Sequence, residues 1–100
     1  MEKSRHCGQD AFFEAVLSLR TPEECGKFFE DVCTIKELQA MVQRFQVACQ
    51  LDEGRNYVEV CEATGASSAT ISRVNKCLHY GSGGYRLALQ RLKKAGKIQK

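Results

Sequence analysis

The sequence predicts an all-α protein of about six helices that form a single domain over residues 1–100. Apolar residues recur at spacings of three and four along most of the chain, as they do on the buried face of a helix. Helix-capping residues precede several of these segments, at Thr21, Thr34, Asn56 and Ser67. The single proline, Pro22, occupies the first helical position after a cap, where its missing N–H costs nothing. Together these features indicate a compact helical protein.

Three helices are expected in the N-terminal half of the chain. The first covers about residues 9–19. The second follows the cap Thr21 and the third follows the cap Thr34, and Glu24 and Glu37 stand three positions after these caps, as a capping box requires. The third is the longest and is expected to end near Glu53, before a glycine.

The first three helices carry more apolar surface than the rest of the chain can cover. All five phenylalanines lie in them, together with many aliphatic residues. A second copy of the chain would bury the surplus, so the sequence predicts a homodimer whose dimerisation helices cover about residues 9–53 and 84–95. A monomer with an unusually aromatic core is the alternative.

Residues 56–78 have the pattern of two short helices joined by a tight turn. Asn56 caps the first helix, and Gly65 stands where that helix must stop in a left-handed conformation. Ser67 caps the second helix. The positions that a helix-turn-helix needs to be apolar carry Val60, Ala66, Ile71 and Val74, and the small residue Cys61 is expected where the two helices cross.

The outward face of the second helix is suited to duplex DNA. Small polar residues at its start and cations further along match a helix whose leading end enters the major groove while its flanks meet phosphates. The candidate DNA-binding residues are Ser67, Ser68, Ala69, Thr70, Ser72, Arg73 and Lys76. The sequence leaves open whether Arg73 and Lys76 contact bases or phosphates. An ordinary helical hairpin within a bundle would show a similar apolar spacing.

The charge distribution favours a polyanionic partner. Residues 1–54 hold six Lys or Arg and ten Asp or Glu, a balance of −4, whereas residues 55–100 hold nine and two, a balance of +7. A basic half that contains a helix-turn-helix is the pattern expected of a protein that binds nucleic acid. A dimer also fits, because two recognition helices can then contact the two halves of a palindromic site.

The remaining segments add little chemistry. Residues 79–84 are expected to form a flexible glycine-rich loop, and a final helix is expected with Tyr85, Leu89 and Leu92 facing inward. The six cysteines show no zinc-site spacing, and those at 25, 49, 61 and 77 fall on apolar helix faces, which favours reduced, buried thiols. We therefore assign neither a metal nor a cofactor.

The sequence contains neither a membrane-spanning run nor a signal peptide, so a cytoplasmic location without membrane contact is expected. An enzyme is the least favoured class, because no acid or nucleophile stands at a recognisable spacing from either His6 or His79. Cys7, beside His6, is left as a candidate redox sensor. The main rival to a DNA-binding regulator is a protein-interaction module that keeps the helix-turn-helix only as a scaffold.

The chain from about Phe12 to Lys94 resembles the tryptophan-repressor superfamily, and is most similar to its bacterial Trp-repressor-like YerC/YecD subfamily. The resemblance is carried by the runs RTPEECGKFFEDVCTIKE, QRFQVACQLDEG and TGASSATISRVNKCLHYG. It implies an intertwined, all-helical homodimer of the Trp-repressor type. It further implies a helix-turn-helix that binds palindromic operator DNA and blocks transcription.

The resemblance also implies an effector pocket, although this chain differs from the repressor at some of the pocket positions. Arg44 and Arg73 match the two arginines that hold the indole of the corepressor tryptophan, and Thr34 matches a threonine from the partner subunit. Cys77 replaces a serine that meets the amino group of the ligand, and Val74 replaces a glycine beside it. A β-branched residue in the space of a hydrogen atom should fill much of the slot. We therefore expect a chain that does not respond to tryptophan, with an unidentified small-molecule effector left open.

Overall fold

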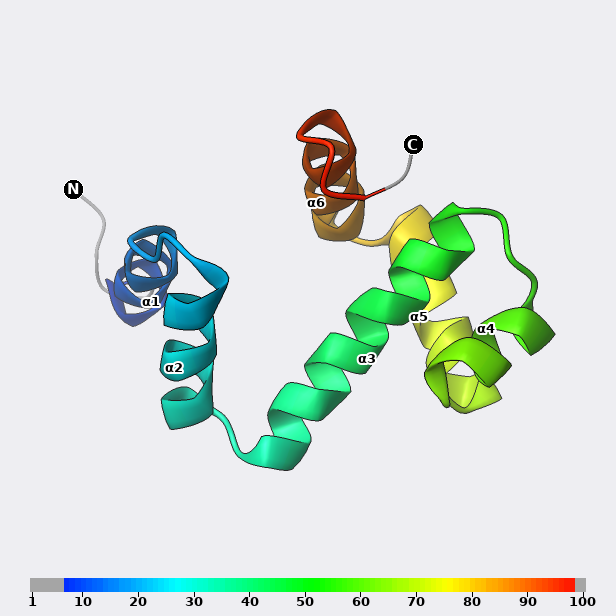
Figure 1. Cartoon of the computed structure of the whole chain (residues 1–100), viewed down its shortest axis with the longest axis horizontal. Helices are drawn as coiled ribbons and strands as arrows, with labels where there is room; N and C mark the ends of the chain where they lie inside the picture. The colour runs from blue at the N-terminus through cyan, green and yellow to red at the C-terminus, as the bar shows by residue number, and fades with distance from the viewer. Residues whose placement is uncertain (1–6, 99–100) are drawn as a thin grey trace. The chain divides into compact units, whose positions relative to one another are not determined.

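The computed structural model describes residues 7–98, and this part of the chain forms six α-helices and no strand (Figure 1). The helices are α1 (Cys7–Leu17), α2 (Pro22–Val32), α3 (Ile35–Asp52), α4 (Tyr57–Thr64), α5 (Ser68–Tyr80) and α6 (Gly84–Lys94). The chain divides into two compact units, one ending at Leu38 and the other beginning at Gln39. The prediction of an all-α fold is confirmed. Among residues 7–98, no helix is long and apolar enough to cross a membrane.

In the first unit, the starts of α2 and α3 follow from their caps. The Thr21 hydroxyl accepts a hydrogen bond from the backbone N–H of Glu24 at 3.1 Å. The Glu24 carboxylate, however, accepts from the N–H of Arg20 and not of Thr21, so the expected capping box closes one residue earlier. At α3 the predicted box is complete, since Thr34 and Glu37 each accept from the backbone N–H of the other.

The helices α1 and α2 have a cluster of aromatic rings but no buried side chain among residues 8–33. Phe28 and Phe29 pack edge to face at 5.3 Å, and Phe12 lies 5.8 Å from Phe28. Large apolar side chains nevertheless stay open to solvent, above all Leu17, which is 76% exposed. The first helix also starts and ends two residues earlier than expected. This unit by itself therefore leaves much apolar surface uncovered.

The second unit contains the buried core. The core residues come from α3 to α6 and from the turn after α4, and they are Val47, Ala48, Val60, Ala66, Ile71, Val74, Leu78 and Leu89. Phe45, Leu51 and Tyr85 are partly buried against them. The four apolar positions expected for a helix-turn-helix, residues 60, 66, 71 and 74, are all buried, as predicted.

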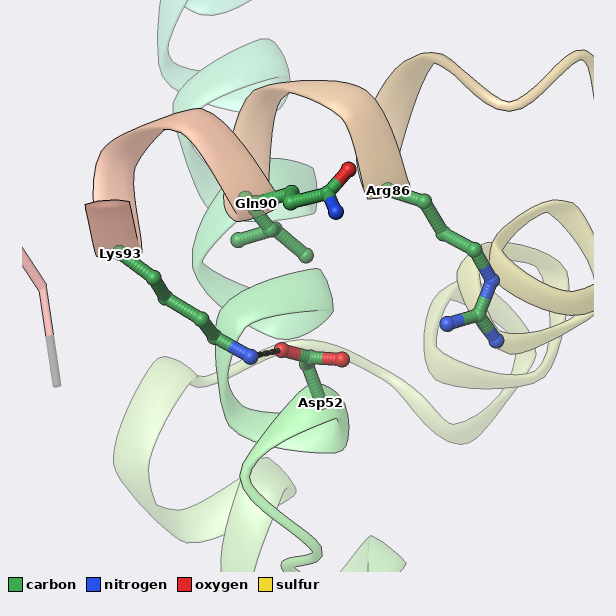
Figure 2. A pocket seen from close by; sticks show the side chains of 5 residues that line it. Asp52, Arg86, Gln90 and Lys93 are labelled. Carbon is green, nitrogen blue, oxygen red and sulfur yellow. Dashed lines mark hydrogen bonds and ion pairs between the residues drawn. The ribbon is translucent and has the colours of Figure 1, made fainter. Parts of the chain in front are cut away.

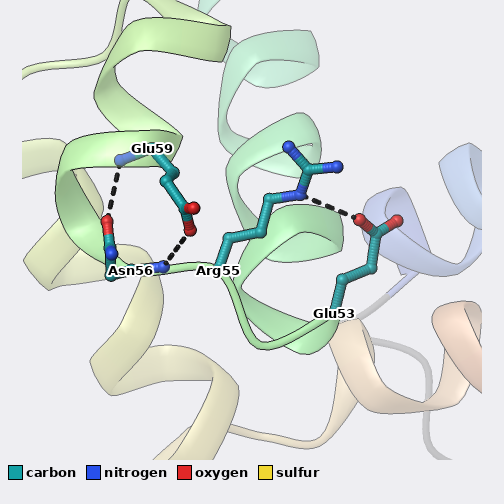
Figure 3. Close-up of polar contacts among 4 residues, drawn as sticks. All are labelled: Glu53, Arg55, Asn56 and Glu59. Atoms are coloured by element: carbon teal, nitrogen blue, oxygen red, sulfur yellow. Dashed lines mark hydrogen bonds and ion pairs between the residues drawn. The ribbon is translucent and has the colours of Figure 1, made fainter.

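The connection from α3 into α4 is fixed by polar contacts (Figure 3). Asn56 and Glu59 form the predicted capping box, in which each side chain accepts the backbone N–H of the other residue, at 2.9 and 3.0 Å. Just before it, Arg55 makes a surface ion pair with Glu53 at 3.4 Å. The capping box thus satisfies the backbone N–H groups of Asn56 and Glu59 where the helix-turn-helix starts.

The last helix is attached to the end of α3 (Figure 2). Leu89 is buried in the core, and Lys93 donates a hydrogen bond to the carboxylate of Asp52 in a partly buried ion pair. Next to this pair, burial raises the pKa of the Cys49 thiol, and the negative charges of Glu53 and Asp52 raise it further. Cys49 is therefore held as the neutral thiol.

Two expectations about the second unit are corrected. The segment 79–84 is not wholly a loop, because α5 continues through His79 and Tyr80 and only residues 81–83 connect it to α6. His79 is therefore helical, whereas His6 lies outside the described residues. Cys61 and Cys77 are exposed, so the expectation of buried thiols is wrong at these two positions. Cys25 and Cys49, for which the same was expected, are partly buried.

Candidate nucleic-acid interface

The turn between α4 and α5 is held by a glycine and a threonine. Gly65 has φ +75°, a left-handed conformation in which a side chain would be strained. The Thr64 hydroxyl donates to the carbonyl of Val60 at 2.8 Å and accepts from the N–H of Ala66 at 3.2 Å. From α3, the Gln43 amide donates to the Thr64 carbonyl at 3.1 Å. Hydrogen bonds from Thr64 and Gln43 therefore fix this turn together with the conformation of Gly65.

The inner face of α5 is buried along its length. Ile71 and Val74 are each 1% exposed, and Leu78 is also buried. These side chains lie at spacings of three and four and join the core formed with α3, α4 and α6. Because one face of α5 is fixed in this way, the opposite face and the leading end are held in a defined direction.

The leading end of α5 is open to solvent. Ser67, Ser68 and Ala69 are exposed, whereas Thr70 is partly buried. The Ser67 hydroxyl accepts the N–H of Thr70 at 3.2 Å as the predicted cap and also donates to the Thr70 hydroxyl. Ser67 and Thr70 therefore use part of their hydrogen-bonding capacity on each other, whereas Ser68 makes no side-chain hydrogen bond within residues 7–98.

Polar and basic side chains continue along the outer face of α5. Ser72, Arg73 and Lys76 are all exposed. Neither Arg73 nor Lys76 pairs with an acidic side chain within the described part of the chain, where the ion pairs are Arg55–Glu53 and Lys93–Asp52. The two cations are free to meet phosphates or base edges. All seven candidate DNA-binding residues lie on α5 or at its cap, and six of them are exposed.

The structure places further residues beside the leading end of α5. Tyr57 and Val58 lie in the first turn of α4 and are exposed, Val58 to 68%. Together with Cys61 and Ser68 they line a hollow between α4 and α5. Tyr57 and Val58 are neither small and polar nor basic, the residue types expected at a DNA contact, so the sequence pattern did not single them out. The available signal was Val58, a bulky apolar residue out of helical register with the buried Val60.

The candidate effector residues are distributed over both units. Arg44 on α3 is partly buried, and Arg73 and Cys77 on α5 are exposed. Thr34 belongs to the first unit, where its hydroxyl caps α3. Val74, at the position where the repressor has a glycine, is buried in the core. Its side chain therefore serves to pack α5.

The hollow between the end of α3 and α6 is a weaker candidate for a ligand site (Figure 2). Asp52, Arg86, Gln90 and Lys93 line it. The Asp52 carboxylate is already paired with Lys93, and the Arg86 guanidinium donates to Nδ1 of His79 at 3.1 Å. Its charged groups therefore have partners within the protein. No group of three or more potential metal ligands occurs within residues 7–98.

Comparison with known proteins agrees with this geometry. Residues 8–93 match the model of the Trp repressor protein family. The uncharacterized protein YerC of Bacillus subtilis (strain 168) is 48% identical over 93 residues, covering 93% of this chain and 89% of YerC.

Two solved structures are also similar. A TrpR-like protein from Eubacterium eligens ATCC 27750 has a TM-score of 0.87 and 47% identity, covering 98% of both chains. A Trp repressor candidate from Staphylococcus aureus has a TM-score of 0.84 and 40% identity, covering 92% of this chain and 94% of its own. The chain therefore belongs to the Trp repressor family, within the Trp-repressor-like group that includes YerC.

Proposed function

We propose that this chain is a helix-turn-helix transcriptional regulator that binds palindromic duplex DNA as a homodimer and acts as a repressor. The observation that carries the proposal is the leading end of α5, which is exposed and polar while its inner face is fixed in the core. Such a helix can enter the major groove without rearranging the protein. The proposed DNA contacts are Ser67, Ser68, Ala69, Thr70, Ser72, Arg73 and Lys76.

The proposed homodimer is supported by the first unit. None of the side chains of residues 8–33 is buried, and Phe13, Leu17 and Val32 are each at least half exposed. A protein rarely leaves so many large apolar side chains in water without a partner that covers them. A twofold dimer would also supply the second recognition helix that a palindrome requires.

Binding to DNA is tested by a salt titration with the variant Arg73→Ala. The protein should bind a duplex selected from a random pool, with an affinity that falls steeply as log salt rises. Arg73→Ala should cost about 1–3 kcal/mol in each half-site if the guanidinium contacts a base, and should reduce the salt slope if it contacts phosphate. Fluorescence anisotropy of a labelled duplex measures both quantities.

The matched control for this experiment is Arg91→Ala. Arg91 is exposed on α6, outside the helix-turn-helix, so the variant removes the same charge without changing a candidate DNA-binding residue. Its affinity should stay close to that of the wild-type protein. Weak binding of every duplex, with equal effects of the two variants, would favour the rival function, a protein-interaction module on a helix-turn-helix scaffold.

We further propose that tryptophan is not the effector. Val74 stands where the resemblance implies a glycine beside the ligand, and its side chain is 1% exposed, so a pocket there would have to displace a core side chain. Isothermal titration with L-tryptophan should give no saturable heat, and DNA affinity should be unchanged by millimolar tryptophan. Micromolar binding would contradict this proposal and leave Thr34, Arg44, Arg73 and Cys77 as the pocket.

A further inference from the structure

An apolar hollow lies between α4 and α5, beside the proposed DNA-binding end of α5. It has a volume of about 360 Å³ and is lined almost wholly by apolar atoms. Ile71 is the one buried lining residue, and the others are Tyr57, Val58, Cys61, Glu62 and Ser68. The five other lining residues are all exposed, so the hollow opens to solvent.

The position of the hollow relates it to DNA. Ser68 is the first residue of α5, so one edge of the hollow is the leading end of the recognition helix. In helix-turn-helix proteins that end meets base edges while the preceding helix crosses the backbone. If α5 binds DNA as proposed above, the hollow between the two helices is continuous with the surface that meets the major groove.

The chemistry of the lining selects which part of DNA can enter. A phosphate needs cations or free N–H donors, and the lining holds no Lys or Arg while Glu62 would repel a phosphate. The major-groove edges of the bases present one apolar group, the 5-methyl of thymine. An apolar hollow of this size accommodates a methyl group together with the carbon edge of its base.

We propose that the hollow between α4 and α5 binds the 5-methyl group of a thymine in each half-site, and so makes the operator depend on thymine at that position. This inference rests on the proposed function. In this proposed thymine site, Val58 and Cys61 contact the methyl group and determine specificity, whereas Arg73 and Lys76 attract the negatively charged DNA. The contact removes apolar surface of both protein and DNA from water.

The test replaces thymines by deoxyuridine, which pairs identically and lacks only the methyl group. Each thymine of a duplex selected from a random pool is replaced in turn, and the affinity is measured by fluorescence anisotropy. At one symmetric pair of positions, deoxyuridine should weaken binding by about fourfold per site and about fifteenfold for both, the factor expected for a buried methyl group. Replacement at other positions should have little effect.

A variant connects the effect to the hollow. Val58→Thr keeps the shape of an exposed side chain but replaces one methyl group with a hydroxyl. It should reduce the thymine-to-uracil ratio, which is the affinity for the thymine duplex divided by that for the deoxyuridine duplex, while the protein still binds DNA. The control Ala63→Ser makes a similar change at an exposed position of α4 outside the hollow, and it should keep the full ratio.

The outcomes separate this inference from the proposed function. Tight duplex binding with no thymine-to-uracil difference at any position would overturn the thymine site and leave DNA binding intact. Failure to bind any duplex would overturn both. If Val58→Thr weakens self-association in sedimentation experiments and leaves the thymine-to-uracil ratio unchanged, the hollow is a contact between copies of the chain, and the inference is wrong.

Discussion

Replacing Leu17 with lysine is expected to convert the protein into monomers and to weaken operator binding by about a hundredfold or more. Leu17 is 76% exposed on α1, so its replacement removes little packing within one chain. In the proposed homodimer this side chain is covered, and a buried ammonium without a partner would be costly. The loss of affinity follows because each half-site would then be bound separately.

Sedimentation equilibrium and duplex binding measure the two effects. The control Ser18→Lys adds the same charge at the neighbouring exposed residue, and it should leave both the mass and the affinity near those of the wild-type protein. The added positive charge cannot itself explain weaker binding to DNA, since it attracts phosphate. A Leu17→Lys protein that stays dimeric at the same concentration would contradict the proposed role of α1.

Replacing Ile71 with alanine is expected to destabilise the protein by about 2–5 kcal/mol, a large share of the stability of a small domain. Ile71 is 1% exposed at the centre of the core that holds α5 against α4 and α3. The truncation leaves a cavity that a short helix pair cannot easily close. The melting temperature should fall by about 10 °C or more.

Circular dichroism at a fixed protein concentration measures this loss, because the stability of a dimer depends on concentration. Ser72→Ala is the matched control, since it alters the next residue on the exposed face of α5. Its effect should stay within about 0.5 kcal/mol. If the two variants were equally stable, α5 would not be supported by this core, and the proposed presentation of its leading end would lose its basis.

The helices and their caps could be predicted because they depend on local interactions. Thr34 with Glu37 and Asn56 with Glu59 form their capping boxes within four residues of chain. The left-handed turn at Gly65 follows from the one residue type that adopts it without strain. A spacing of three and four was likewise sufficient to identify Ile71 and Val74 as buried.

Other features could not be predicted, because they depend on which helices pack against each other in the folded chain. The periodicity placed Cys61 and Cys77 on apolar faces, yet both thiols are exposed because the helices packed against α4 and α5 cover other sides. The pairing of Lys93 with Asp52 joins residues 41 positions apart, a relation that no local pattern contains. The glycine-rich composition of residues 79–84 likewise predicts a loop, whereas α5 continues for two residues past Leu78.

The amino-acid sequence by itself determined the helical class, the helix-turn-helix and its buried positions, since hydrogen bonds between near neighbours and the period of a helix are properties of short segments. Only the tertiary structure decided that α4 and α5 leave an apolar hollow beside Ser68, with Val58 and Cys61 in its wall. The hollow depends on how the two helices are placed against each other. That geometry is set by the packing of both against the same core, which residue order alone does not specify.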